Sequence, residues 1–175
     1  NFGEVPNLDL RLTAAELAHG RKILHELFPS DNPTICIFTF ATGSKMLDRD
    51  WWSAFYQKLK TQYSGYNLLE ILPMENVSQI DFACPTFYSK DIREIGAVIA
   101  SSKVFIGADS GIMHLASSVH TPILGLFGVT PPAKYEPYNN NSISLDRDHL
   151  GVENTLATLK KILEANDPAH AASPK

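Results

Sequence analysis

The stretch 103–132, KVFIGADSGIMHLASSVHTPILGLFGVTPP, constrains the fold more than any other part of the chain. It begins with the apolar run 104–106, breaks at Gly107, and continues with a helical pattern after Asp109. It ends with a second apolar run over 123–127. A strand, a tight turn, a helix and a strand in this order form a βαβ unit, in which the crossover is right-handed and the strands are parallel.

The rest of the chain repeats the same alternation of apolar runs and amphipathic helical patterns. Strands are predicted at 34–40, 67–72, 82–88, 104–106, 123–127 and 142–145. Further helices are predicted at 14–27, 51–63, 90–100 and 152–163, where Thr13 with Glu16, Asp50 and Ser89 supply capping residues for the first three. The alternation predicts an α/β fold with a doubly wound, mostly parallel Rossmann-like sheet.

Length and composition favour one ordinary globular domain. A chain of 175 residues can bury about two-thirds of its unfolded surface in one core. Because we find no internal repeat and no second core, we expect a single Rossmann-like domain at 1–165 and a frayed tail at 166–175. The chain starts at Asn1 without an initiator methionine, so we expect it to be a piece of something longer.

Charge and cysteine content exclude several classes of partner. The formal net charge of −4 disfavours nucleic acid and anionic membranes, because both require a basic face. Cys36 and Cys84 lie in apolar runs and suggest buried free thiols in a reducing compartment. No apolar run reaches the ~20 residues of a membrane span, and we see no signal-peptide pattern.

Polar residues follow the fourth predicted strand, where a parallel sheet binds its ligands. The amides of Ser110 and Gly111 at the start of a helix, with the positive end of the helix dipole, form a phosphate-binding arrangement. Asp109 would repel a phosphate but accepts hydrogen bonds from hydroxyls, so it suits a sugar. The alternative is that Asp109 or Ser110 only caps the helix. His114 in the first helical turn lies close to such an anion, although a lone histidine here is more often packed or solvated.

The first predicted strand also ends in a polar, glycine-containing segment, ATGSK. Thr42 and Ser44 are small residues that allow the backbone close to a ligand, and Lys45 supplies a charge suited to phosphate. The spacing is not that of a P-loop, which disfavours nucleotide hydrolysis. The alternative is a solvated loop lysine.

After the second strand, Glu75 occupies the place at which an acidic residue often binds ribose hydroxyls. A solvent-exposed loop glutamate is the alternative. All three strand ends share one edge of a parallel sheet, so a lysine, free amides and a carboxylate for ribose together describe a nucleoside diphosphate, with Asp109 left for an attached sugar. We find no nucleophile elbow, no zinc-type spacing and no dinucleotide fingerprint, and therefore expect no cofactor and no metal.

These motifs resemble glycosyltransferase family 9, the heptosyltransferase-like enzymes. Members carry Asp-(Ser/Thr)-Gly-x-x-His-x-Ala after a strand, then a proline-led strand that ends in Leu-(Phe/Tyr)-Gly-x-Thr-x-Pro. The matching positions here are Asp109, Ser110, Gly111, His114, Ala116, Pro122, Leu126, Phe127, Gly128, Thr130 and Pro132. The sequence departs from the family after Lys45, where MLDRDWW replaces the common Lys-x-Trp-Pro.

The resemblance implies the C-terminal donor-binding half of a GT-B glycosyltransferase. The whole enzyme would be inverting and would move a sugar, often heptose from ADP-heptose, to lipopolysaccharide core or a related glycan. The glycolipid acceptor and the catalytic base would belong to a missing N-terminal domain, so this domain alone would be inactive. The resemblance implies a cytoplasmic location and leaves open peripheral association with the inner membrane. The alternative is a non-catalytic nucleotide-binding or interaction module with the same fold.

Overall fold

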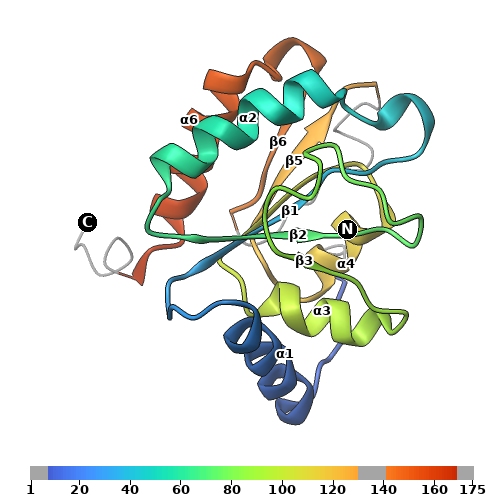
Figure 1. Ribbon diagram of the computed structural model, residues 1–175, viewed down its shortest axis with the longest axis vertical. Coiled ribbons are helices and arrows are strands. Elements are labelled where there is room, and N and C mark those ends of the chain that lie inside the picture. The colour runs from blue at the N-terminus through green and yellow to red at the C-terminus, as the bar shows by residue number, and fades with distance from the viewer. Residues whose placement is uncertain (1–7, 130–140, 169–175) are drawn as a thin grey trace, which may run out of the picture.

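A six-stranded, all-parallel sheet forms the centre of the computed structural model, which describes residues 8–129 and 141–168 (Figure 1). The strand order is β3-β2-β1-β4-β5-β6. The strands are β1 (Thr34–Phe38), β2 (Asn67–Ile71), β3 (Thr86–Phe87), β4 (Val104–Ala108), β5 (Ile123–Phe127) and β6 (Ile143–Asp146). The predicted α/β fold with a mostly parallel, Rossmann-like sheet is confirmed.

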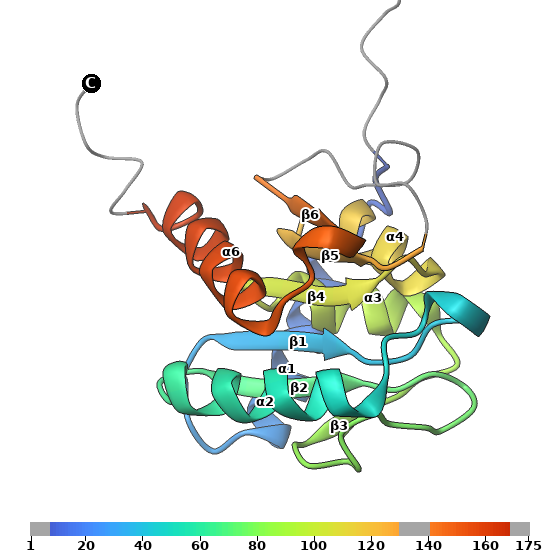
Figure 2. The ribbon, with the colours of Figure 1, turned by 90° about the horizontal axis from the view of Figure 1, so that it is seen from above.

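Helices cover both faces of this sheet (Figures 1 and 2). The α-helices are α1 (Ala14–Leu27), α2 (Arg49–Gln62), α3 (Ile92–Ala100), α4 (Gly111–Ser118) and α6 (Val152–Ala165), and short 3₁₀ turns are η1 (Gly43–Lys45) and η2 (Arg147–His149). Helices α2 and α6 pack on one face, and α1, α3 and α4 pack on the other. None of the helices in the described ranges has the length and apolarity to cross a bilayer.

The central strands β1, β4 and β5 are almost entirely apolar because each faces two cores. On β1, Ile35 and Ile37 enter the core beneath α2 and α6, whereas Cys36 and Phe38 enter the core beneath α1, α3 and α4. Successive side chains of a strand point to opposite faces, so both sets must be apolar. Burying each large side chain contributes about 1.5–3 kcal/mol relative to exposure.

Several predicted boundaries were wrong for local reasons. Strand β1 ends at Phe38, just before Thr39, whose hydroxyl bonds to Glu70 of β2, and β4 continues through Gly107 to Ala108. The predicted strand 82–88 is only the pair 86–87. The chain before it makes turns in which Asp81 and Phe82 adopt left-handed backbone angles.

Two predicted caps were also wrong. Asp48, not Asp50, caps α2 by accepting a hydrogen bond from the amide of Trp51 at 2.7 Å. Asp91, not Ser89, caps α3 by accepting from the Arg93 amide at 2.9 Å. The predicted capping box at the start of α1, made by Thr13 and Glu16, is confirmed. The prediction of buried free thiols at both cysteines is confirmed as well.

Candidate functional site

The carboxyl ends of three neighbouring strands bring together the loops that carry the predicted donor-binding residues. Strands β2, β1 and β4 are adjacent, and they are followed by Glu75, by the segment 42–45, and by the segment 109–114. After β1 the chain turns to α2 on one face, whereas after β4 it turns to α4 on the other. The two loops therefore separate between β1 and β4, which is the topological switch point at which open α/β sheets bind ligands.

The start of α4 has the geometry of an anion site. Ser110 is the N-cap and its hydroxyl accepts a hydrogen bond from the Met113 amide at 3.2 Å, so Ser110, rather than Asp109, fulfils the alternative capping role. The amides of Gly111 and Ile112 lie at the first two helical positions, where a helix offers them no acceptor. A Cβ at Gly111 would meet no heavy atom within 4 Å, so the backbone is open to close approach from outside.

Asp109 lies between two basic side chains. Its carboxylate is 5% exposed; Oδ2 is 2.9 Å from Nζ of Lys45, and Oδ1 is 3.7 Å from Nε2 of His114. Lys45 reaches this position from the 3₁₀ turn after β1, in which Gly43 adopts a left-handed angle of φ +58° that favours glycine. The lysine compensates the charge of the buried carboxylate, so the predicted phosphate residue and the predicted sugar residue form one ion pair.

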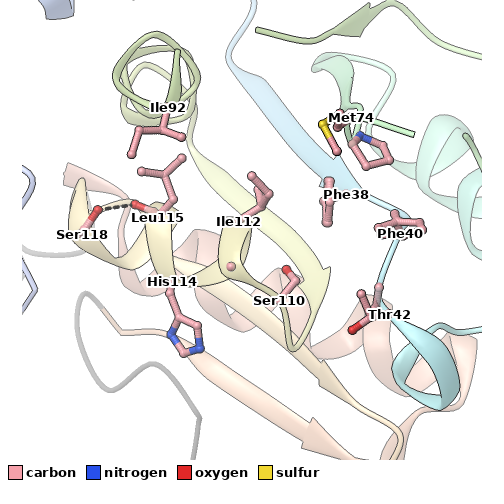
Figure 3. A pocket seen from close by; sticks show the side chains of 13 residues that line it. Phe38, Phe40, Thr42, Met74, Ile92, Ser110, Ile112, His114, Leu115 and Ser118 are labelled. Carbon is pink, nitrogen blue, oxygen red and sulfur yellow. Dashed lines mark hydrogen bonds between the residues drawn. The ribbon is translucent and has the colours of Figure 1, made fainter. Parts of the chain in front are cut away.

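A cavity of about 590 Å³ opens beside this pair, between α4 and the ends of β1 and β2 (Figure 3). It is mainly apolar, and it is lined by Phe38, Phe40, Ala41, Thr42, Pro73, Met74, Ile92, Ser110, Gly111, Ile112, His114, Leu115 and Ser118. In Figure 3, Ile92, Leu115 and Ile112 form one side, and Met74, Phe38 and Phe40 face them from the other. An apolar cleft with a few polar groups at one end is typical of small-molecule sites.

The predicted residues occupy different places around the cavity. Thr42, Ser110, Gly111 and His114 line it. Lys45 and Asp109 form the ion pair at its side, whereas Ser44 is exposed on the 3₁₀ turn and contributes no lining surface.

Glu75 is exposed and also contributes no lining surface, although its neighbour Met74 does. The described residues contain no group of three or more His, Cys, Asp or Glu side chains that could hold a metal ion.

The apolar walls of the cavity and a buried acid behind it were not predicted from the sequence. Met74 in the loop after β2 is 78% exposed and Ile92 at the start of α3 is 59% exposed; a methionine in the loop after a strand is a signal that could have been noticed. Glu70 on β2 is fully buried and accepts hydrogen bonds from Thr39 and Ser78. Burial raises the pKa of the Glu70 carboxyl, and the two hydroxyl donors lower it. Its signal was a single charge within the apolar run NLLEIL.

Comparison with known proteins shows that part of the chain, including the segment 109–114, is similar to one family. Residues 84–162 match the family model of glycosyltransferase family 9 (heptosyltransferase). Lipopolysaccharide heptosyltransferase 3 of Escherichia coli is 44% identical over 50 residues, covering 29% of this chain and 15% of that protein. The protein of the same name from E. coli strain K12 is 33% identical over 95 residues, covering 43% and 28%. The chain thus spans less than a third of the length of either relative.

Solved structures share the fold at low identity. The glycosyl transferase family 9 from Veillonella parvula DSM 2008 superposes with a TM-score of 0.75 at 16% identity, covering 90% of this chain and 54% of that chain. The E. coli heptosyltransferase WaaC with ADP superposes with a TM-score of 0.63 at 17% identity, covering 85% and 48%. These structures show the fold, whereas the predicted resemblance to family 9 is confirmed by the family model and the two E. coli relatives.

Proposed function

We propose that this chain, a relative of the family 9 heptosyltransferases, is the C-terminal, donor-binding half of an inverting GT-B glycosyltransferase. Its ligand is a nucleoside-diphosphate sugar, with ADP-heptose as the first candidate, because a heptosyltransferase of this fold carries ADP in its solved structure. The observation that carries the proposal is the placement of a helix N-terminus, a Lys–Asp–His group and an apolar cavity at one switch point of the sheet. We assign the domain to residues 1–165 and the tail to 166–175.

The diphosphate would lie over the start of α4. The amides of Gly111 and Ile112 would donate to its oxygens, and the positive end of the helix dipole would attract its charge. Lys45 reaches this region on a flexible stem and can exchange its partner Asp109 for a phosphate oxygen. His114, 43% exposed on the first turn, would add a further donor.

The base and the ribose would lie toward the cavity. Its facing walls of Ile112 and Phe38 suit a flat heteroaromatic ring, which gains stability by leaving water. Thr42 at one end offers a hydroxyl, and Glu75 follows the wall residue Met74 closely enough in sequence for a ribose contact. The predicted roles of Thr42, Ser44 and Glu75 stay proposals.

Asp109 would accept hydrogen bonds from the transferred sugar. During transfer, an acceptor hydroxyl oxygen would bond to the anomeric carbon as the bond from that carbon to the diphosphate breaks, with its electron pair remaining on the diphosphate. The hydroxyl proton would pass to a base in the other half of the enzyme. This chain would contribute Lys45 and the α4 amides, which stabilise the charge that develops on the leaving diphosphate.

We further propose that the chain alone binds donor without transferring it, that the other half binds a glycolipid acceptor such as lipopolysaccharide core, and that the enzyme is cytoplasmic. Calorimetric titration with ADP, UDP, GDP and ADP-heptose tests the donor site. We expect ADP to bind in preference to UDP and GDP, and Asp109→Ala to weaken ADP-heptose more than ADP. Equal weakening of both ligands would contradict the sugar role. If none of the four ligands binds this chain or the full-length protein, the proposal is overturned. The alternative of an interaction module with the same fold would then be favoured.

A further inference from the structure

Glu70 is a buried carboxyl that lies behind the proposed donor site. It is the last residue but one of β2, near the carboxyl edge of the sheet, and its side chain is fully buried. Thr39 donates its hydroxyl proton to Oε1 at 2.7 Å, and Ser78 donates its hydroxyl proton to Oε2 at 2.8 Å. The two hydroxyls come from the loops that follow β1 and β2. One carboxyl therefore joins two loops that are separate in sequence.

Each hydroxyl in turn holds backbone amides. Thr39 Oγ1 accepts from the Gln79 amide at 3.0 Å. Ser78 Oγ accepts from the amides of Ile80 at 3.1 Å and Phe82 at 3.0 Å. Both lone pairs of the Ser78 oxygen are thus used, so its proton must be donated, and Glu70 Oε2 must be an acceptor. These bonds therefore determine which group donates and which accepts at the Ser78–Glu70 contact.

The same network supports an unfavourable backbone. Asp81 and Phe82 have φ values of +53° and +56°, a left-handed conformation that non-glycine residues adopt at a cost of about 1 kcal/mol each. The bonds from Ile80 and Phe82 to Ser78 surround these two positions. Ser78, anchored by Glu70, therefore maintains the shape of the segment 78–82.

That segment contacts the loop that carries Lys45. Gln79 Nε2 lies 3.3 Å from Sδ of Met46, the residue next to Lys45. Arg49 donates from Nη1 to the Ser78 carbonyl at 3.3 Å and pairs with Asp81. The chain from Thr39 to Arg49 is thus held at its start through Glu70 and at its end through the segment that Glu70 anchors.

We propose that Glu70 is a positioning residue, which fixes through Thr39 and Ser78 the two loops that present Lys45 and Met74 to the donor. The inference rests on the proposed function for its effect on donor binding, but the coupling of the two loops is independent of it. Glu70 itself contacts no donor. A displacement of about 1 Å in a supporting group can change the affinity or rate of a site by an order of magnitude or more.

The test compares two buried threonines in loops at opposite edges of the sheet. Thr39→Val removes the hydroxyl that bonds Glu70 at the carboxyl edge. Thr121→Val is the control, because Thr121 is equally buried, 2% exposed like Thr39, and donates one hydrogen bond to the Ile99 carbonyl at the opposite edge. Both variants lose one buried hydroxyl, but Thr39→Val breaks two hydrogen bonds and Thr121→Val breaks one, so we expect the melting temperature to fall in both and further in Thr39→Val. Only Thr39→Val should weaken ADP binding, by about tenfold or more, whereas Thr121→Val should stay within about twofold.

Glu70 variants grade the same effect. In Glu70→Gln the side-chain carbonyl can still accept from the Ser78 hydroxyl, and the side-chain NH₂ can donate to the Thr39 hydroxyl oxygen. We therefore expect this variant to retain most of its ADP affinity. Glu70→Leu removes both acceptors and should weaken ADP at least as much as Thr39→Val. If Glu70→Leu does not fold, Ser78→Ala replaces it. ADP affinity that is unchanged in Thr39→Val, while its melting temperature falls at least as far as that of the control, would overturn the proposal.

Hydrogen exchange separates this inference from the proposed function. If the unaltered chain does not bind ADP, the donor proposal fails, and exchange still decides the coupling. Thr39→Val should speed amide exchange over 43–46 and 78–82 relative to Thr121→Val. The same exchange pattern in both variants would refute the positioning role.

Discussion

Replacing Lys45 by methionine tests whether its ion pair with Asp109 belongs to the binding site. Lys45→Met removes the ammonium group and keeps an unbranched stem of similar length. Breaking a fully buried pair costs about 3–5 kcal/mol, whereas an exposed pair is worth about 0–1 kcal/mol. Here Asp109 is 5% exposed and Lys45 is 39% exposed, with 2.9 Å between Nζ and Oδ2. We therefore expect the variant to lose about 1–2 kcal/mol of unfolding free energy.

The effect on ADP binding follows from the same geometry. Lys45→Met removes a cation and the lysine partner of Asp109, so it should weaken ADP by about tenfold, or 1.4 kcal/mol. Asp109→Asn should leave ADP affinity unchanged or improved, because it releases Lys45 from its partner and removes a negative charge. In the double variant, Lys45→Met should cost less ADP affinity than it costs alone, because no carboxylate remains to repel the diphosphate.

Urea unfolding and calorimetry on the two single variants and the double variant measure both effects. Lys22→Met is the control, since Lys22 is 71% exposed and its pair with Glu26 spans 3.8 Å. It should change stability by less than about 0.5 kcal/mol and leave ADP affinity unaltered. The reasoning would be refuted if Lys45→Met had the same unfolding free energy and the same ADP affinity as the unaltered chain. It would also be refuted if the effects of the two single variants on ADP affinity were strictly additive in the double variant.

Two further predictions concern the packing of α1. Gly20→Ala should destabilise the chain by about 1–3 kcal/mol in urea unfolding, because a Cβ there would lie 2.3 Å from the carbonyl oxygen of Ala97. Gly65→Ala is the control and should change stability little, because a Cβ there would meet no heavy atom within 4 Å. Equal losses of stability in the two variants would contradict a role of the contact with Ala97. The Arg93 guanidinium lowers the pKa of Glu16 to about 2 from 4.5, so the charge contributes stability above about pH 4.5 that is lost as the pH falls toward 2. Glu16→Gln should accordingly melt below the unaltered chain at pH 6 and equal to it near pH 2, and a difference independent of pH would exclude the charge as its cause.

Much of the fold could be predicted because local chemistry determines it. The run over 123–127 is apolar at every position since β5 is buried on both faces, and it matches the observed strand. The helix at 14–27 was predicted at its observed limits because Thr13 and Glu16 form a capping box. The strand at 82–88 was predicted too long because Phe82 lies in a turn, where its amide donates a hydrogen bond to the Ser78 hydroxyl. The apolar pattern of 82–88 does not indicate this bond.

The site was predictable where a single loop carries the chemistry and unpredictable where contacts are long-range. The segment 109–114 showed a helix start, and parallel topology implied that it meets the segment 42–45. The ion pair of Lys45 with Asp109 joins residues 64 positions apart, so no spacing rule could reveal it. The same holds for the cavity walls and for Glu70, whose partners come from two different loops. The predicted segment from Thr130 to Pro132 lies outside the described residues.

We propose that the loops after three strands contact one nucleotide. The most direct test is to add ADP to the isotope-labelled chain and record which amide chemical shifts change. We expect the largest shifts on 42–45, 73–75 and 110–114, with little change in α6 or around the N-terminal edge of the sheet near Thr121. Shifts confined to other segments would contradict the proposed site, and an unchanged spectrum at saturating ADP would contradict nucleotide binding by this chain.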